Sequence, residues 1–253
     1  EANDMDTSLE EVYVTNETTD IAERAFYNCD SLEVIHIEGT LENVGAYAFA
    51  YCDRLEEVIL ADSIKTFSTS VFSNSASLKK VWLPASLEQL ERNIFYSSKN
   101  TLVELRTPFL GESRTSTDNC SLNYLFDNNN SVYNYVSKLE TLIILGGNIS
   151  GKGISNSNIV NLTIPVYASE GVYFTVTDIH AFRSVENLYF AGTLEDWCNI
   201  NNGTINAHEN GDNFYILDEK GEYYLLNESE TLVIPASVTY ISPYAFYKIE
   251  GVK

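Results

Sequence analysis

The chain has 253 residues, and its 36 acidic and 15 basic residues give a formal net charge of −21 at pH 7. This charge repels phosphate backbones and anionic lipid surfaces, which argues against a nucleic acid or a membrane surface as partner. The sequence has no apolar run of the roughly 18 residues that a membrane-spanning helix needs, and it opens on no signal segment. We therefore expect no membrane insertion by this chain, and any signal or anchor to lie outside it.

One pattern recurs every 23 residues from Leu9 onward. Each of the first four units opens on L-x-x-V-x-L or a close variant and carries a phenylalanine 17 positions after its first leucine. The first four units place these residues at Leu9, Val12, Val14, Ile21 and Phe26; Leu32, Ile35, Ile37, Val44 and Phe49; Leu55, Val58, Leu60, Phe67 and Phe72; and Leu78, Val81, Leu83, Leu90 and Phe95. A fixed period of this length with this opening is typical of a leucine-rich solenoid.

Each unit predicts one short strand and a return leg. Strand side chains alternate, so the apolar residues at the fourth and sixth positions of a unit lie on one face. The return leg offers only short stretches such as Glu23 to Asn28, enough for a helical turn but not for a stable helix. We predict a leucine-rich repeat solenoid of β-rich α/β type, with a parallel strand ladder and short helical turns and loops on the return leg. One coil cannot cover its own apolar face, so neighbouring coils must stack.

The pattern is interrupted twice, and we predict both interruptions as irregular insertions in a single domain of residues 1–253. Residues 1–7 fit no unit and are expected to be loose. The first insertion covers about residues 107–138, where Pro108, Gly111 and the polar run 127–130 break the pattern. The second covers about residues 192–228. In it, residues 214–217 and 222–226 flank a four-residue turn and predict a β-hairpin. The pattern resumes between and after the insertions at Leu142, Leu162, Leu188 and Leu232.

The four cysteines, Cys29, Cys52, Cys120 and Cys198, show no C-x-x-C pair and no histidine at zinc-finger spacing. Cys29 and Cys52 are one period apart, so stacking brings their Cα atoms to about 4.8 Å, within disulfide range. Parallel inward side chains keep the Cβ atoms farther apart than a bridge prefers. We expect free thiols in a column of small buried residues that Ser75 and Ser98 continue.

The third and fifth residues of each unit point away from the core and form two outward columns. The third positions are Glu11, Val34, Glu57, Lys80, Glu104, Thr141, Asn161, Asn187 and Thr231, and the fifth are Tyr13, His36, Ile59, Trp82, Arg106, Ile143, Thr163, Tyr189 and Val233. Together they predict an open sheet of nine strands.

Within these columns the candidate ligand-binding residues are Tyr13, His36, Trp82, Arg106 and Tyr189. Tyr, Trp and Arg are the side chains that most often anchor interfaces. Aromatic and β-branched residues also suit any pleated surface, so ordinary strand chemistry explains the columns equally well. A contiguous apolar patch around Trp82 would favour binding, whereas a uniformly polar face would favour a spacer.

No enzymatic or metal site is indicated. A nucleophilic triad needs a base beside its nucleophile, and the three histidines, His36, His180 and His208, fall on a strand face, a turn and a polar loop. The acidic loops 127–130 and 209–213 lack EF-hand spacing, and residues 146–153 lack the ending of a phosphate loop. We expect no catalytic residues, no metal and no cofactor.

The run Ala48-Phe49-Ala50-Tyr51-Cys52, with its A-F-x-x-C signature, resembles the BspA-like leucine-rich repeats of bacterial surface proteins. The segment Gly192 to Cys198, followed by the hairpin, is similar to a variation in such proteins from gut bacteria. The resemblance implies a secreted or surface-anchored protein associated with adhesion to host matrix proteins, other bacteria or surfaces. The two insertions depart from the family pattern, which puts in doubt whether a ligand site on regular coils extends to them.

The sequence thus favours a non-enzymatic secreted or cell-surface bacterial protein. We expect a monomer that binds a protein or glycan ligand, as in adhesion, through the exposed strand face. One alternative is a structural spacer or stalk that presents another domain. A further alternative is a carbohydrate-active hydrolase, because a chain with 36 acidic residues offers carboxylate pairs.

Overall fold

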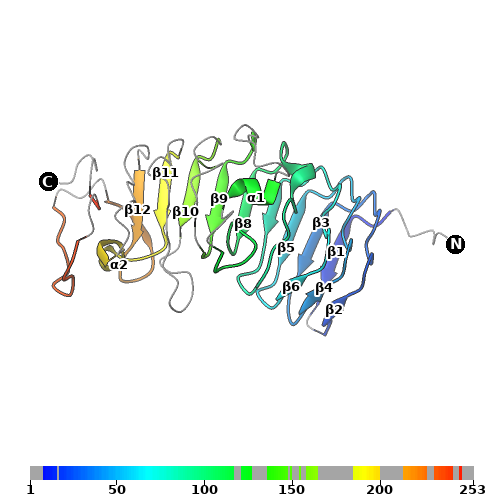
Figure 1. Ribbon diagram of the computed structural model, residues 1–253, viewed down its shortest axis with the longest axis horizontal. Helices are drawn as coiled ribbons and strands as arrows, with labels where there is room; N and C mark the ends of the chain where they lie inside the picture. Colours follow the sequence, from blue (N-terminus) through cyan, green and yellow to red (C-terminus); the bar gives the residue numbers. More distant parts are fainter. Residues whose placement is uncertain are drawn as a thin grey trace.

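The computed structural model describes residues 8–15, 17–116, 121–126, 136–147, 149, 154, 158–164, 185–199, 213–226, 231–241 and 245–246. Ten strands form one sheet in the order β1-β3-β5-β7-β8-β9-β10-β11-β12-β13. Figure 1 shows them side by side in chain order along the long axis of the molecule. Their bounds are β1 Glu11–Val14, β3 Val34–Ile37, β5 Glu57–Leu60, β7 Lys80–Trp82, β8 Glu104–Thr107, β9 Thr141–Ile144, β10 Asn161–Ile164, β11 Asn187–Phe190, β12 Asn213–Leu217 and β13 Tyr223–Leu225.

The return legs hold little regular structure. Three two-residue strands, β2 (Asp20–Ile21), β4 (Asn43–Val44) and β6 (Thr66–Phe67), form a second parallel sheet. The helices are the short η1 (Tyr96–Ser98), α1 (Leu122–Phe126) and α2 (Leu194–Asn199). This arrangement confirms the predicted leucine-rich repeat solenoid. No helix among the described residues has the length and apolar character to span a membrane.

A column of phenylalanine rings runs through the core and confirms the 23-residue pattern. Phe26, Phe49, Phe72 and Phe95 stack with ring centroids 5.4, 5.9 and 6.0 Å apart. Phe126, from α1 in the first predicted insertion, continues the column at 5.7 Å from Phe95. The irregular segment therefore supplies a ring at the place where the next coil would have supplied one.

The column of small residues is also buried as predicted. The Cys52 thiol donates to the carbonyl of Phe26 at 3.1 Å. The Ser75 hydroxyl donates to the carbonyl of Phe49 at 2.8 Å, and Ser98 donates to that of Ser75 at 2.7 Å. Cys29 and Cys52 are free thiols, and burial raises the pKa of Cys52 to about 12. Each side chain thus ties its own coil to the preceding one. Cys120 lies outside the described residues.

The position predicted for the ninth strand is wrong. The sequence assigned it to the unit containing Thr231 and Val233, but residues 231–241 form no strand and Val233 is 75% exposed. Instead β12 pairs parallel with β11, with Asn187 opposite Asn213. The predicted hairpin is present, since β13 pairs antiparallel with β12. The physical reason is competition for an edge: β12 buries Phe214 and Ile216 on the free side of β11, and β13 then takes the next place.

The rest of the last unit packs loosely against the end of the core. Leu232, Ile234 and Phe246 are partly buried hydrophobic residues in contact with the core cluster. The indole nitrogen of Trp197 in α2 donates to the carbonyl of Ala245 at 2.8 Å, which joins this unit to the second insertion. The organisation of residues 1–253 as one domain stays a prediction.

Candidate functional site

The strand register places the outward residues in two continuous columns, which we call the outer face. One column is Glu11, Val34, Glu57, Lys80, Glu104, Thr141, Asn161, Asn187 and Asn213, and the other is Tyr13, His36, Ile59, Trp82, Arg106, Ile143, Thr163, Tyr189 and Tyr215. All five candidate residues therefore lie in one column. They are not one cluster, because Arg106 and Tyr189 are three strands, about 14 Å, apart. The role of these residues in binding stays a prediction.

The outer face over β1, β3, β5, β7 and β8, which we call the charged half, carries a chain of side-chain contacts. Tyr13 meets His36 edge to face with ring centroids 5.4 Å apart. His36 Nε2 lies 2.9 Å from Glu57 Oε1, and Lys80 Nζ lies 3.8 Å from Glu57 Oε2. Lys80 Nζ also stands 4.6 Å from the centre of the Trp82 ring. Aromatic rings at both ends and the Glu57–Lys80 ion pair between them thus hold one another across four adjacent strands.

Trp82 is not the centre of an exposed apolar patch. Its indole nitrogen donates to Glu104 Oε1 at 2.5 Å, and the side chain is only partly exposed. Tyr13 is the one exposed large hydrophobic side chain described on this half of the outer face. Among the described residues, the others lie elsewhere: Leu9, Tyr51, Tyr96, Tyr223, Val233, Tyr240 and Ile241. Any ligand of this half would therefore be recognised mainly by charge and hydrogen bonding.

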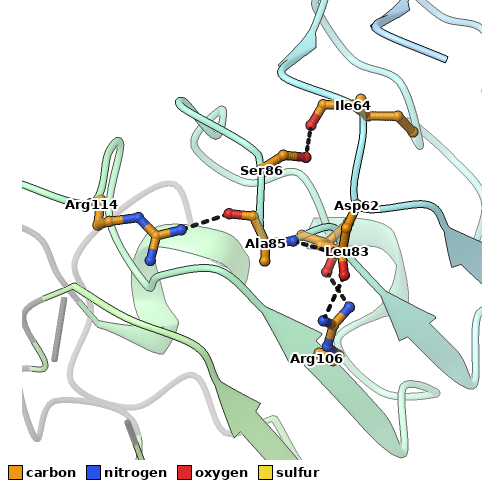
Figure 2. A network of polar contacts seen from close by, with 7 residues as sticks. All are labelled: Asp62, Ile64, Leu83, Ala85, Ser86, Arg106 and Arg114. Atoms are coloured by element: carbon orange, nitrogen blue, oxygen red, sulfur yellow. Dashed lines mark hydrogen bonds and ion pairs between the residues drawn. The ribbon is translucent and has the colours of Figure 1, made fainter. Parts of the chain in front are cut away.

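Arg106 belongs to a second network, which Figure 2 shows at the ends of strands β5, β7 and β8. Its guanidinium donates to the carbonyl of Leu83 at 3.2 Å and lies 3.4 Å from Asp62 Oδ2. Asp62 also accepts from the backbone N–H of Ala85 at 2.6 Å, and Arg114 donates to the Ala85 carbonyl at 2.7 Å. Burial lowers the pKa of Arg114. Arg106 is therefore a clamp on three consecutive coils as well as an outward residue, which the sequence did not indicate.

The outer face over β9 to β13, which we call the uncharged half, has different chemistry. The Asn187 amide donates to Asn161 Oδ1 at 2.9 Å, and the Asn213 amide donates to Asn187 Oδ1 at 2.8 Å. Beside this asparagine ladder, the rings of Tyr189 and Tyr215 stack 4.5 Å apart. Tyr223 meets Tyr189 at 5.2 Å with the rings 75° apart. Burial is the main cause that raises the pKa of Tyr189 and of Tyr223, so both hydroxyls are neutral at physiological pH.

Sequence reasoning missed Tyr215, Tyr223 and Asn213 because they lie in the second predicted insertion. The signal that could have found them is a change of period. Asn161, Asn187 and Asn213 are spaced by 26 residues, and so are Tyr189 and Tyr215. A search for the 23-residue period alone passes over this spacing.

Possible metal ligands are not clustered in the described part of the chain. There, no group of three or more His, Cys, Asp or Glu side chains could hold a metal ion. His180 and His208 lie outside the described residues, as do the loop 127–130 and residues 209–212 of the second acidic loop.

Comparison with known proteins gives a family match over the regular coils. Residues 5–123 match the BspA type leucine rich repeat region in six copies, which confirms the resemblance found in the sequence. A crystal structure of a leucine rich repeat protein from T. pallidum is similar at 17% identity, with 72% of this chain and 73% of that chain covered and a TM-score of 0.38.

A second similar structure is a leucine rich cell surface protein from Faecalibacterium prausnitzii A2-165. It is 18% identical, with 94% of this chain and 52% of that chain covered and a TM-score of 0.35. This chain thus spans about half the length of that protein. A search among curated protein sequences gave no match.

Proposed function

We propose that this chain, whose residues 5–123 are a BspA-type leucine-rich repeat region, binds a protein partner through the charged half of its outer face. The observation that carries the proposal is the run of contacts from Tyr13 through His36, Glu57 and Lys80 to Trp82. Side chains held in place before binding lose less conformational entropy when a partner arrives. The run therefore favours recognition over a merely solvated surface.

The partner surface is expected to carry mixed charge. One column carries Glu11, Glu57, Lys80 and Glu104, while Arg106 stands in the other. Such a pattern gives specificity and a fast encounter to a partner of complementary charge. Because exposed charges are screened by salt, the association rate should fall as ionic strength rises.

The location and biological use follow from the family. BspA-like repeats are associated with bacterial surface proteins, so we place the chain outside the cell, in adhesion to host or bacterial surfaces. We take the chain as non-enzymatic, in line with leucine-rich repeat proteins in general. A spacer role is the competing function. The lack of an exposed apolar patch around Trp82 among the described residues favours it, and it requires no binding by the outer face.

The test is a binding screen of the whole chain against host matrix proteins, repeated with a Trp82→Ala, Arg106→Ala double variant. An interface anchor that contributes about 2 kcal/mol is worth about 30-fold in affinity, so loss of both anchors should weaken binding by roughly 700-fold if the two contributions add. Tyr96→Ala is the control, because Tyr96 is an aromatic residue on the return leg, away from the outer face, and is 47% exposed.

Arg106 also joins three consecutive coils, so its loss could weaken binding by destabilising the fold. A second variant is therefore needed. Tyr13→Ala removes a side chain that is 61% exposed and whose ring contacts His36, and it should leave folding intact. It should weaken binding by about tenfold. If the double variant and Tyr13→Ala both bind as well as wild type, the charged half is not the site and the spacer role is favoured.

A further inference from the structure

We propose that the uncharged half of the outer face is a second binding site, a platform for a neutral oligosaccharide. In this site Tyr189, Tyr215 and Tyr223 contact sugar rings, and Asn161, Asn187 and Asn213 hydrogen-bond to sugar hydroxyls. The site lies on strands β9 to β13, separate from the charged half, and it does not depend on the function proposed for that half.

The tyrosine rings provide the apolar contact. Tyr189 and Tyr215 stand parallel across adjacent strands, with centroids 4.5 Å and planes 11° apart. On the other side of Tyr189, the strand register places Thr163 and then Ile143, whose side chains are shorter than a tyrosine. The pair of stacked rings therefore ends at Tyr189, and the surface is lower over Thr163 on β10. A pyranose ring lying over Thr163 would meet this pair with its C–H groups, the part of a sugar that packs on aromatic surfaces.

The asparagine ladder provides the polar contact. A primary amide has two N–H donors and an oxygen with two lone pairs. In the ladder Asn187 uses one donor toward Asn161 and one lone pair toward Asn213, at 2.9 and 2.8 Å. Each amide retains a second donor and a second lone pair beyond those bonds. Sugar hydroxyls both donate and accept, so they can use the remaining donor and the remaining lone pair of each amide. The hydrogen bonds along the ladder fix the direction in which the amide nitrogen and oxygen point.

The spacing of the ladder favours an extended oligosaccharide. Equivalent amides recur at the strand spacing of about 4.8 Å, close to the length of one pyranose unit. A linear glycan along the ladder would therefore present equivalent hydroxyls to successive asparagines. From β9 to β13 the platform is about 19 Å long, enough for three or four sugar units.

The charge distribution selects a neutral glycan. The outward residues described on β9 to β12 are Thr141, Ile143, Asn161, Thr163, Asn187, Tyr189, Asn213, Tyr215 and Leu217, and none of them is charged at neutral pH. Exposed carboxylates stand just before three of the strands, at Glu140, Glu186 and Glu222. They would repel a sialylated or sulfated chain, as would the net charge of −21.

The experiment measures binding of the full chain to β-1,4-linked hexasaccharides of glucose and of N-acetylglucosamine, by calorimetry, with a sialylated oligosaccharide as the anionic arm. We expect saturable binding of at least one neutral hexasaccharide and weaker binding of the sialylated one. Tyr189→Ala and Asn187→Ala should each weaken it by about tenfold, the effect of losing one aromatic or polar contact. The Trp82→Ala, Arg106→Ala variant should bind the sugar unchanged.

Tyr189→Ala could also disturb folding, so Tyr223→Ala is the second variant, because Tyr223 is exposed at the edge strand. Thermal melting of every variant separates lost binding from lost structure. The proposal is overturned if the wild-type chain binds neither neutral hexasaccharide at millimolar concentration. It is equally overturned if Tyr223→Ala and Asn187→Ala both bind like wild type, or if the platform variants lose only a protein partner. If the charged half binds no matrix protein in the screen, the expected results of the oligosaccharide experiment stay the same.

Discussion

The two halves of the outer face share one ladder but differ in the side chains they display. In the charged half, Glu57 bridges His36 and Lys80, and Lys80 lies over the Trp82 ring. In the uncharged half, identical amides pair along the ladder beside stacked tyrosines. The inward residues of both halves are alike, since Val58 and Leu188 are both buried in the same core. Packing therefore constrains the inner face, while the outer face is left to carry specificity.

The largest expected effect tests whether the core is equally well packed behind the two halves of the outer face. Phe49→Ala and Phe214→Ala should each lower the free energy of unfolding by about 3–5 kcal/mol, because both rings are fully buried. Urea denaturation monitored by circular dichroism measures this. A neutral Phe49→Ala would refute the 23-residue register. A much smaller cost at Phe214 than at Phe49 would show that the second half is packed more loosely.

The next effect concerns the close stacking of the return legs in the coils that carry the charged half. A Cβ on Gly45 would lie 2.4 Å from the backbone nitrogen of Glu23, so the two coils would have to separate. Gly45→Ala should cost about 1–3 kcal/mol, the usual range for overpacking. Ser68→Ala, one period later and exposed, is the matched control and should be neutral. Equal melting temperatures for the two variants would contradict the observed coil spacing.

A smaller effect separates the two kinds of side-chain ladder. Asn187→Ala removes two partly buried hydrogen bonds between side-chain amides and should lower the free energy of unfolding by about 1–2 kcal/mol. Glu57→Ala removes contacts between partly exposed charges and should cost below about 1 kcal/mol. Raising the salt concentration from 0.1 to 1 M should shrink the Glu57 effect and leave the Asn187 effect in place. The same salt response in both variants would remove the distinction between the halves.

The smallest expected effect on stability at neutral pH concerns the buried thiols. Cys52 lies in the coils behind the charged half and Cys198 in α2 near the uncharged half, and both should behave alike. Burial raises the pKa of Cys52 to about 12 and also raises that of Cys198. Both thiols should resist alkylation by iodoacetamide at pH 8 until the chain unfolds, since the thiolate is the reactive form. The folded pKa of Cys52 lies above its unfolded value of 9.0, so its contribution to stability is complete below pH 9 and declines as pH rises toward 12. Cys52→Ser should remove that decline in melts recorded above pH 9.

Much of the candidate site could be predicted, but not how its residues are held. The placement of Tyr13, His36, Trp82, Arg106 and Tyr189 in one column followed from strand alternation alone. The clamp formed by Arg106 could not be predicted, because its partners Leu83 and Asp62 stand 23 and 44 residues away in the chain. Which of two possible neighbours a long side chain contacts depends on turn geometry, and the repeat pattern does not encode it.

The sequence by itself determined the repeat, the inward columns and the likeness to BspA-type repeats, because burial is demanded of the same positions in every coil and leaves a periodic signature. Only the tertiary structure decided which segment forms the ninth parallel strand. Residues 213–217 and 231–234 both carry an alternating apolar pattern, and the free edge of β11 accepts one of them. That choice placed Tyr215 and Asn213 beside Tyr189 and Asn187, and so created the uncharged half. Edge competition involves segments far apart in the chain, so the 23-residue pattern alone could not settle it.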